Sequence, residues 1–200
     1  LSEYLDNKYN DQISLDRQLL EKLWNVTLGS KEQNNAHGVY KRINDQWKQM
    51  GWQRNDPVQD LKATGTLSLR CMVYLGTNYK TRTQEMLRAN RANVKTNYPF
   101  AIVGINMTLL LSDVLKLSKS AFLSERANYW ELFEDADAFY EIFSFCFMYM
   151  DTIWRSRGAT RPDFGKLTFE LKESVTKVLK RGPKSVNEFK MIAVDENMIT

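Results

Sequence analysis

Apolar residues recur at intervals of three and four along almost the whole chain, which is the spacing of one face of an α-helix. The longest such pattern runs from residue 124 to residue 154 and includes Trp130, Phe133, Tyr140, Phe143, Phe147 and Trp154 on one face. No run of alternating apolar and polar residues is bounded by turn residues, as a half-buried strand would be. The sequence therefore predicts an all-α fold, built as a single compact multi-helix domain.

Glycine and proline divide this pattern into separate helices. Helical patterns cover residues 19–24, 40–50, 67–75, 83–92, 100–117, 132–154 and 164–178. Gly29, Gly51 and Gly76 are expected to close the first three of them. The segments 100–117 and 132–154 are apolar on nearly all sides, so we expect them to be the two most buried helices.

The C-terminal part of the chain carries helix-capping signals. Asp163 stands where it would cap the helix that begins with Phe164. Ser185 and Glu188 have the spacing of a capping box, which indicates one short last turn. We expect the tail beyond Met191 to be mobile.

The expected domain spans residues 15–182, with an N-terminal extension at 1–14 and a short helix and tail at 183–200. The first residue is Leu1 rather than methionine, so the sequence leaves the natural start and any targeting signal there open.

Cysteine usage and hydropathy constrain the compartment. Cys71 and Cys146 lie in apolar runs at no metal-binding or redox spacing, which favours a reducing environment. The longest apolar candidate, residues 98–111, is interrupted by polar residues and is too short to span a membrane. We expect no transmembrane segment and a cytoplasmic location, with association with the cytoskeleton left open.

Charge is unevenly distributed along the chain. Residues 31–100 hold 12 Lys and Arg against 5 Asp and Glu, whereas residues 121–151 hold 1 against 7. The basic half suits an anionic partner such as a nucleotide-carrying protein, an acidic lipid surface or nucleic acid. Ordinary solvated helix faces would give the same counts, and this alternative stays open.

No pattern indicates a small-molecule active site. His37 has no cysteine or carboxylate at ligand spacing, and no phosphate-binding glycine loop is present. The acidic residues of 131–141 have the spacing of the wet side of an amphipathic helix. The aromatic residues recur at core spacing, which disfavours nucleic-acid binding. We expect no metal, no cofactor and no enzyme activity of the chain's own.

Two stretches are more specific than helical periodicity. The first is WKQMGWQRNDPVQDLKATGTL (residues 47–67), and the second is YPFAIVGINMT (residues 98–108). Together they resemble the signature of the ELMO (engulfment and cell motility) domain family. Trp154 and the pair Asp163-Phe164 are similar to later family positions, so the resemblance covers roughly residues 15–182.

This resemblance implies a helical domain that acts on small GTPases. Stand-alone members of the family activate GTP hydrolysis by Arf and Arf-like GTPases, and larger relatives scaffold exchange factors for Rac. In the activating members, the triplet of Asp, a hydrophobic residue and a basic residue ends in an arginine proposed to reach the transferred phosphate. Here the triplet is Asp60, Leu61 and Lys62.

The motif residues divide into two predicted roles. Partner-binding residues are expected to be Arg54, Asp60, Lys62 and Arg70. Residues that shape the motif are expected to be Trp47, Gly51, Trp52, Gln53, Pro57, Gly65 and Asn106. We further expect Trp47 and Trp52 to anchor the loop on the core, and Asp60 to cap the helix that follows it.

Lys62 occupies the position of the family's arginine and is the candidate catalytic residue. An inserted arginine stabilises the transition state of phosphoryl transfer, and a lysine lacks its planar fork. We therefore expect binding or regulation of an Arf or Arf-like GTPase rather than strong activation. The alternative is a non-catalytic structural or adaptor subunit of a larger assembly, for example cytoskeletal or ciliary. Lys62 is also explained by an ordinary solvated first-turn lysine.

Overall fold

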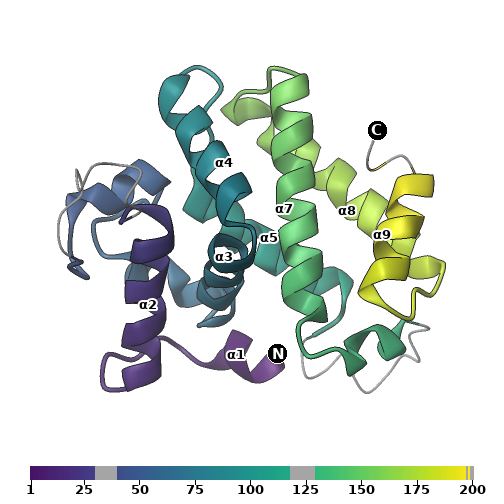
Figure 1. Ribbon diagram of the computed structural model, residues 1–200, viewed down its shortest axis with the longest axis horizontal. Coiled ribbons are helices and arrows are strands. Elements are labelled where there is room, and N and C mark those ends of the chain that lie inside the picture. Colours follow the sequence, from purple (N-terminus) through teal and green to yellow (C-terminus); the bar gives the residue numbers. More distant parts are fainter. Residues whose placement is uncertain (30–39, 118–128, 197, 199–200) are drawn as a thin grey trace. The chain divides into compact units, whose positions relative to one another are not determined.

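The computed structural model describes residues 1–29, 40–117, 129–196 and 198 (Figure 1). Every regular element in these residues is a helix, so the all-α prediction is confirmed. Contacts within this helical fold define two compact units, residues 1–109 and 110–200. The boundary falls inside α5 (Phe100–Val114). No helix in the described part of the chain is long and apolar enough to cross a bilayer.

The first unit is arranged around α3 (Leu67–Asn78). This helix contacts α1 (Ser2–Asp6), α2 (Ser14–Thr27) and α4 (Lys80–Ala92), as Figure 1 shows. Short 3-10 helices connect α2 to α3: η2 (Asp45–Met50), η3 (Pro57–Gln59) and η4 (Leu61–Ala63). The polar helix expected at residues 83–92 is α4, which buries Met86 and Leu87 as predicted.

Gly76 has a different role from the predicted one. It does not end α3, which continues to Asn78. A Cβ atom at this position would lie 2.5 Å from Cγ2 of Val26 in α2. A glycine inside a helix weakens it, but here the missing side chain allows α2 and α3 to approach closely. The periodicity of a single helix contains no information about that neighbour.

The helix expected at residues 40–50 is only the 3-10 helix η2. Asn44 caps it, because its side-chain oxygen accepts a hydrogen bond from the Gln46 amide at 3.0 Å. Gly51 closes it with a φ of +85°, as the sequence predicts for a glycine at a helix end. The apolar spacing of this segment is therefore correct, whereas its length as a helix is not.

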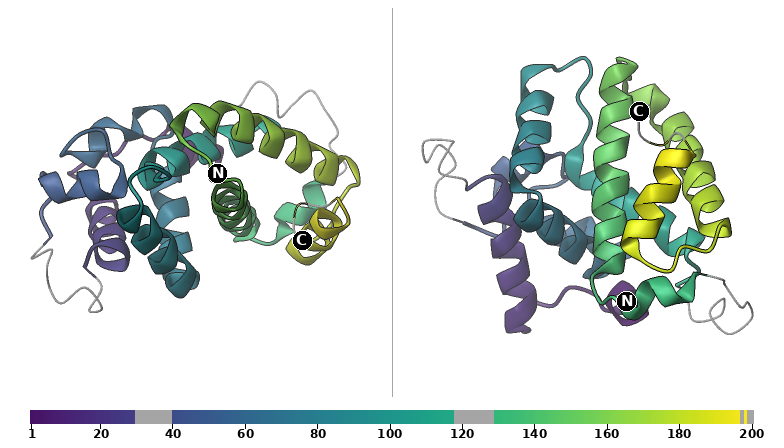
Figure 2. Two further views of the ribbon diagram at one scale, coloured as in Figure 1. Left: turned by 90° about the horizontal axis from the view of Figure 1, so that it is seen from above. Right: turned by 45° about the vertical axis from the view of Figure 1, so that its right-hand side comes forward.

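The second unit is built on α7 (Ala138–Ser156), α8 (Phe164–Lys180) and α9 (Val186–Asp195), which contact one another (Figure 2). The apolar pattern of residues 132–154 does not form one continuous helix. It is divided into the 3-10 helix η5 (Trp130–Glu134) and α7. The Asp135 side chain accepts a hydrogen bond from the Asp137 amide at 2.9 Å, which favours a turn over a continuing helix.

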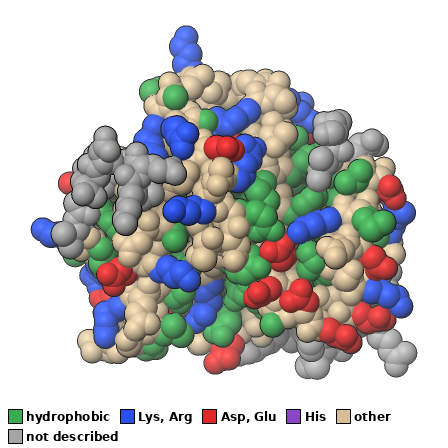
Figure 3. Space-filling model, in the orientation of Figure 1, with side chains coloured by type: hydrophobic (Ala, Val, Ile, Leu, Met, Phe, Trp, Pro, Cys, Tyr) green, Lys and Arg blue, Asp and Glu red, His purple; other side chains and the backbone are tan. Residues whose placement is uncertain are grey.

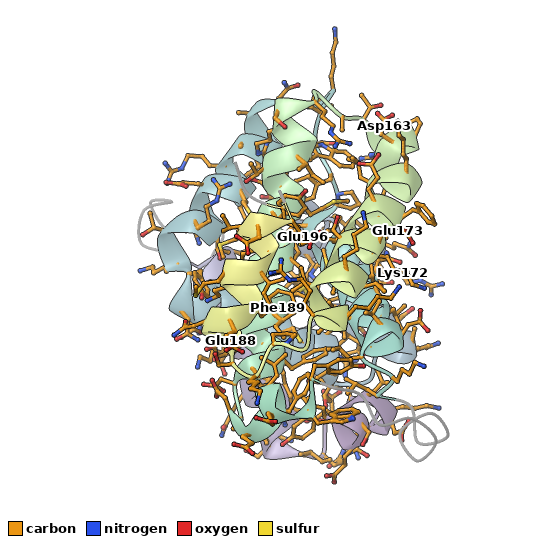
Figure 4. All side chains as sticks on the ribbon, turned by 90° about the vertical axis from the view of Figure 1, so that its right-hand side faces the viewer. Asp163, Lys172, Glu173, Glu188, Phe189 and Glu196 are labelled. Carbon is orange, nitrogen blue, oxygen red and sulfur yellow. The ribbon has the colours of Figure 1, made fainter. Side chains whose placement is uncertain are left out.

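The C-terminal segment is a full helix rather than one short turn. Ser185 caps α9 as predicted, accepting a hydrogen bond from the Glu188 amide at 3.2 Å. Phe189 packs edge-to-face on Phe145 with 5.8 Å between ring centroids, and Figure 4 shows its place on α9. The expected mobility beyond Met191 is therefore wrong as far as the end of α9.

Asp163 does not donate its carboxylate to the start of α8. It closes the preceding 3-10 helix η6 (Arg161–Asp163), where it accepts hydrogen bonds from the amide and hydroxyl of Thr160, both at 2.9 Å. These bonds to the Thr160 backbone and side chain lower the pKa of Asp163 from its ordinary value. The capping signal was real, but it belongs to the turn in front of the helix.

Removal of a buried ring from α7 should destabilise the protein far more than removal of an exposed ring from α8. Phe143 is 0% exposed and packs on Phe147, whereas Phe169 is 63% exposed. We expect Phe143→Ala to lower the free energy of unfolding by about 3–5 kcal/mol. The matched change Phe169→Ala should stay within about 0.5 kcal/mol. Urea denaturation measures both, and equal losses would show that α7 is not a core helix.

Candidate functional site

The candidate site is the motif loop, residues 52–64, which lies entirely within the first unit. Trp47 in η2 anchors it and is 0% exposed. Its ring meets Trp24 of α2 edge-to-face at 4.9 Å and Trp52 at 6.1 Å between centroids. Its indole N–H donates to the carbonyl of Arg42 at 2.9 Å. The ring is thus both packed and hydrogen-bonded, which holds the start of the loop against α2.

Tyr40 completes this aromatic cluster. Its ring meets Trp24 at 6.1 Å and Trp47 at 6.5 Å, both edge-to-face. Burial raises the pKa of Tyr40 above its ordinary value, and the carboxylates of Glu21 and Asp56 add to the shift. The phenol therefore stays neutral at physiological pH.

Gly51 lies where the two motif stretches meet. Its φ of +85° is a left-handed conformation that favours glycine. A Cβ atom here would lie 2.2 Å from Cα of Pro99, which belongs to the second stretch. The backbone of residue 51 therefore packs directly on the backbone of residue 99, and no side chain fits between them.

Two carboxylates organise the interior of the loop. Asp56 is buried, accepts a hydrogen bond from the Val58 amide at 3.2 Å and pairs with Arg42 at 3.3 Å. Asp60 accepts a hydrogen bond from the Gln53 amide at 2.8 Å. Asp60 makes no capping bond to η4, so the predicted cap is wrong. It closes the loop on itself instead, and the cap of the motif is Asp56 at the start of η3.

The predicted cations differ in their surroundings. Arg54 is exposed and donates to the Gln59 side chain at 2.5 Å. Lys62 is exposed and makes no hydrogen bond or ion pair with any described residue. Arg70 in α3 is half-buried, with its guanidinium 3.9 Å from the ring centroid of Tyr4. The structure thus places Arg54 and Lys62 on one closed loop and directs Arg70 to the N-terminal segment.

The N-terminal segment is part of the site, which sequence reasoning missed. Gly65 has a φ of +53°, and a Cβ atom there would lie 2.5 Å from the carbonyl oxygens of Tyr4 and Asn7. The amide of Thr66 donates to both of these carbonyls at 3.0 Å. The glycine of the motif was the available signal, but its partner is main chain and leaves no pattern in the sequence.

The remaining motif residues are structural. Pro57 is buried at the first position of η3, as expected for a rigid turn. The side chain of Asn106 donates to the Ile102 carbonyl of its own helix at 2.8 Å. Cys71 is fully buried, which raises the pKa of its thiol and makes it unreactive.

The described residues contain no group of three side chains of the kind that binds a metal ion. His37 lies outside the described residues. In the acidic stretch 131–141, Glu131 pairs with Lys184 at 3.5 Å and Glu141 with Lys190 at 2.7 Å. Both ion pairs lie within the second unit. These contacts give the stretch a surface role.

A helical unit that presents cations on a rigid loop defines a protein-interaction domain rather than an enzyme with an enclosed pocket. The model of the ELMO/CED-12 family matches residues 1–168. The chain belongs to this family, which is associated with the regulation of small GTPases.

Curated relatives carry the same domain in longer proteins. The chain is 38% identical to human ELMO domain-containing protein 2 over 100 residues, which is 50% of the chain and 31% of that protein. It is 24% identical to Dictyostelium discoideum ELMO domain-containing protein A, over 90% of the chain and 20% of that protein. For bovine ELMO domain-containing protein 3 the figures are 26%, 90% and 45%. The chain thus spans less than half the length of each.

Replacement of Gly51 should be far more costly than replacement of a glycine with similar backbone geometry in open space. Gly158 has a φ of +59° and nothing within 4 Å of a Cβ atom. We expect Gly158→Ala to cost about 1 kcal/mol, which reflects the left-handed backbone alone. Gly51→Ala should cost about 1–3 kcal/mol more, because the Pro99 backbone must move. Equal losses in urea denaturation would contradict the close packing of the two motif stretches.

Proposed function

We propose that this chain binds a small GTPase of the Arf or Arf-like group through the motif loop, with Arg54 and Lys62 directed toward the bound nucleotide. The observation that carries this proposal is the pair of exposed cations on a loop with a fixed backbone. A GTP-loaded switch protein presents anionic phosphates beside its switch segments. Cations that are already positioned bind such a surface at a smaller entropic cost than cations on a flexible loop.

Lys62 favours binding over activation in this proposal. Its ammonium group has the charge of an arginine and comparable reach, and no described partner competes for it. It lacks the planar fork that contacts two phosphate oxygens at once. We therefore propose that the chain recognises the GTP-bound state and accelerates hydrolysis weakly at most.

The adaptor role is the second candidate, and the same residue favours it. A domain that has lost the family's arginine while it keeps the anchoring tryptophans retains a stable fold without the group that acts on the phosphate. In this case the chain would be a non-catalytic subunit of a larger assembly, for example cytoskeletal or ciliary, and Arg54 and Lys62 would be ordinary surface residues.

Binding is tested by pull-down and titration with a panel of Arf and Arf-like GTPases in GTP-loaded and GDP-loaded forms. We expect at least one GTP-loaded member to bind, and Arg54→Ala and Lys62→Ala each to weaken binding by about tenfold, or 1.4 kcal/mol. Lys22→Ala removes the same charge from the exposed side of α2 and should leave binding unchanged. The absence of any nucleotide-dependent binding across the panel would remove the GTPase proposal.

Catalysis is tested separately by single-turnover GTP hydrolysis with the wild-type chain, Lys62→Arg and Lys62→Ala. If the loop faces the nucleotide, Lys62→Arg should raise the rate by about tenfold or more, because it restores the fork at a positioned site. Lys22→Arg makes the same change far from the loop along the chain and should have no effect. Identical rates for all variants across the panel would leave the adaptor role.

A further inference from the structure

The end of α4 and the connection to α5 form a basic tip, which we define as Arg88, Arg91, Val94 and Lys95. All four residues are exposed. Val94 is 79% exposed, the highest value among the large apolar side chains in the described part of the chain. Partial burial, together with the nearby charge of Arg88, lowers the pKa of Arg91 from its ordinary value. Two of the cations are therefore close enough to repel each other.

Lys and Arg side chains dominate this part of the surface. Figure 3 shows them gathered over α4 with little acidic surface among them. Glu85 is the one acidic residue of α4, and it pairs with Arg82 at 3.4 Å, which leaves the cations of the tip without an acidic residue on their own helix.

The connection that carries Val94 is held in a fixed shape. The amide of buried Asn90 spans its base, donating to the Tyr98 carbonyl at 3.1 Å and accepting from the Tyr98 amide at 3.4 Å. At its far end, the Asn93 side chain accepts a hydrogen bond from the Lys95 amide at 3.1 Å. Val94 lies in the middle of this turn. An exposed aliphatic side chain on a rigid turn is not explained by the packing of the first unit.

We propose that the basic tip docks the protein on the surface of an anionic membrane, with Val94 inserted among the lipid headgroups and Arg88, Arg91 and Lys95 in contact with their phosphates and carboxylates. The charge and the geometry support this together. Each cation near an anionic bilayer strengthens binding about fivefold, and the buried apolar tip adds a comparable factor.

A bilayer fits the tip better than a macromolecular partner. A stable protein interface buries about 800 Å² on each side around aromatic or large aliphatic anchors, and the tip offers one valine. Single-stranded nucleic acid requires exposed aromatic rings for base stacking, but Tyr98 and Phe100 next to the tip are buried. Docking on a bilayer needs only a small apolar insertion and a ring of cations.

Vesicle co-sedimentation tests the proposal with the full chain. Vesicles of phosphatidylcholine with 30% phosphatidylserine should bind the protein, and pure phosphatidylcholine vesicles should not. We expect Lys95→Ala, Arg88→Ala and Val94→Ser each to weaken binding about fivefold, and the triple variant by about a hundredfold. Higher salt should release the wild-type protein because it screens the charges.

Matched controls separate the tip from general charge and hydrophobicity. Lys22→Ala and Leu15→Ser remove one exposed cation and one half-exposed aliphatic side chain from α2, and both should bind as the wild type does. Thermal unfolding shows whether each variant is folded. Equal binding by the tip variants and the wild type would overturn the proposal, as would equal binding to both kinds of vesicle.

Insertion is measured directly with an environment-sensitive fluorophore on Val94→Cys. The native Cys71 and Cys146 are fully buried with raised pKa values, so labelling is confined to the new thiol. Anionic vesicles should shift the emission to shorter wavelength, and the same label on Leu15→Cys should not respond. A response to polyglutamate but not to vesicles would assign the tip to an acidic protein and overturn the membrane proposal.

Discussion

The burial of Trp47 between Trp24 and Trp52 is the contact on which the rest of the site depends. One ring joins η2 to α2, and its indole N–H satisfies the carbonyl of Arg42 in the segment that precedes η2. Removal of such a ring costs several kcal/mol, a large part of the net stability of a domain of this size. The motif loop has little regular structure of its own and inherits its position from this cluster.

Close backbone packing limits the loop on both sides of that anchor. Gly51 lies against Pro99 before the loop, and Gly65 lies against the carbonyl groups of the N-terminal segment after it. Between these points, the Asp60 carboxylate binds the Gln53 amide and shortens the free span. The result is a rigid base with flexible side chains, since Arg54 and Lys62 can adjust to a partner while their backbone does not move. Such an arrangement favours recognition, because little order remains to be gained on binding.

The sequence predicted the features that depend on residue type and local spacing. Trp47 and Trp52 are buried as expected, Gly51 ends its helix, and Pro57 begins a turn. Local spacing could not predict contacts with distant main chain. For this reason Gly76 was taken for a helix end although it packs on Val26, and Asp60 was taken for a cap although it binds the Gln53 amide.

The N-terminal segment shows the same limit in another form. Its weak apolar pattern indicated an extension, yet carbonyl groups of Tyr4 and Asn7 bind the Thr66 amide at the end of the motif. Main-chain acceptors are present at every residue, so no choice of side chain marks them in advance. The break between η5 and α7 has a comparable origin, because apolar spacing continues through Asp135 while its side chain favours a turn.

Native-state hydrogen exchange of the Trp47 indole N–H tests the central claim most directly. This proton is buried and bonded to the Arg42 carbonyl, so it should exchange only when the aromatic cluster opens. We expect its opening free energy to equal that of the slowest amides of α3, and to fall with urea as steeply as theirs does. Exchange at a free energy near zero, independent of urea, would show that the cluster opens locally and that the loop has no fixed base.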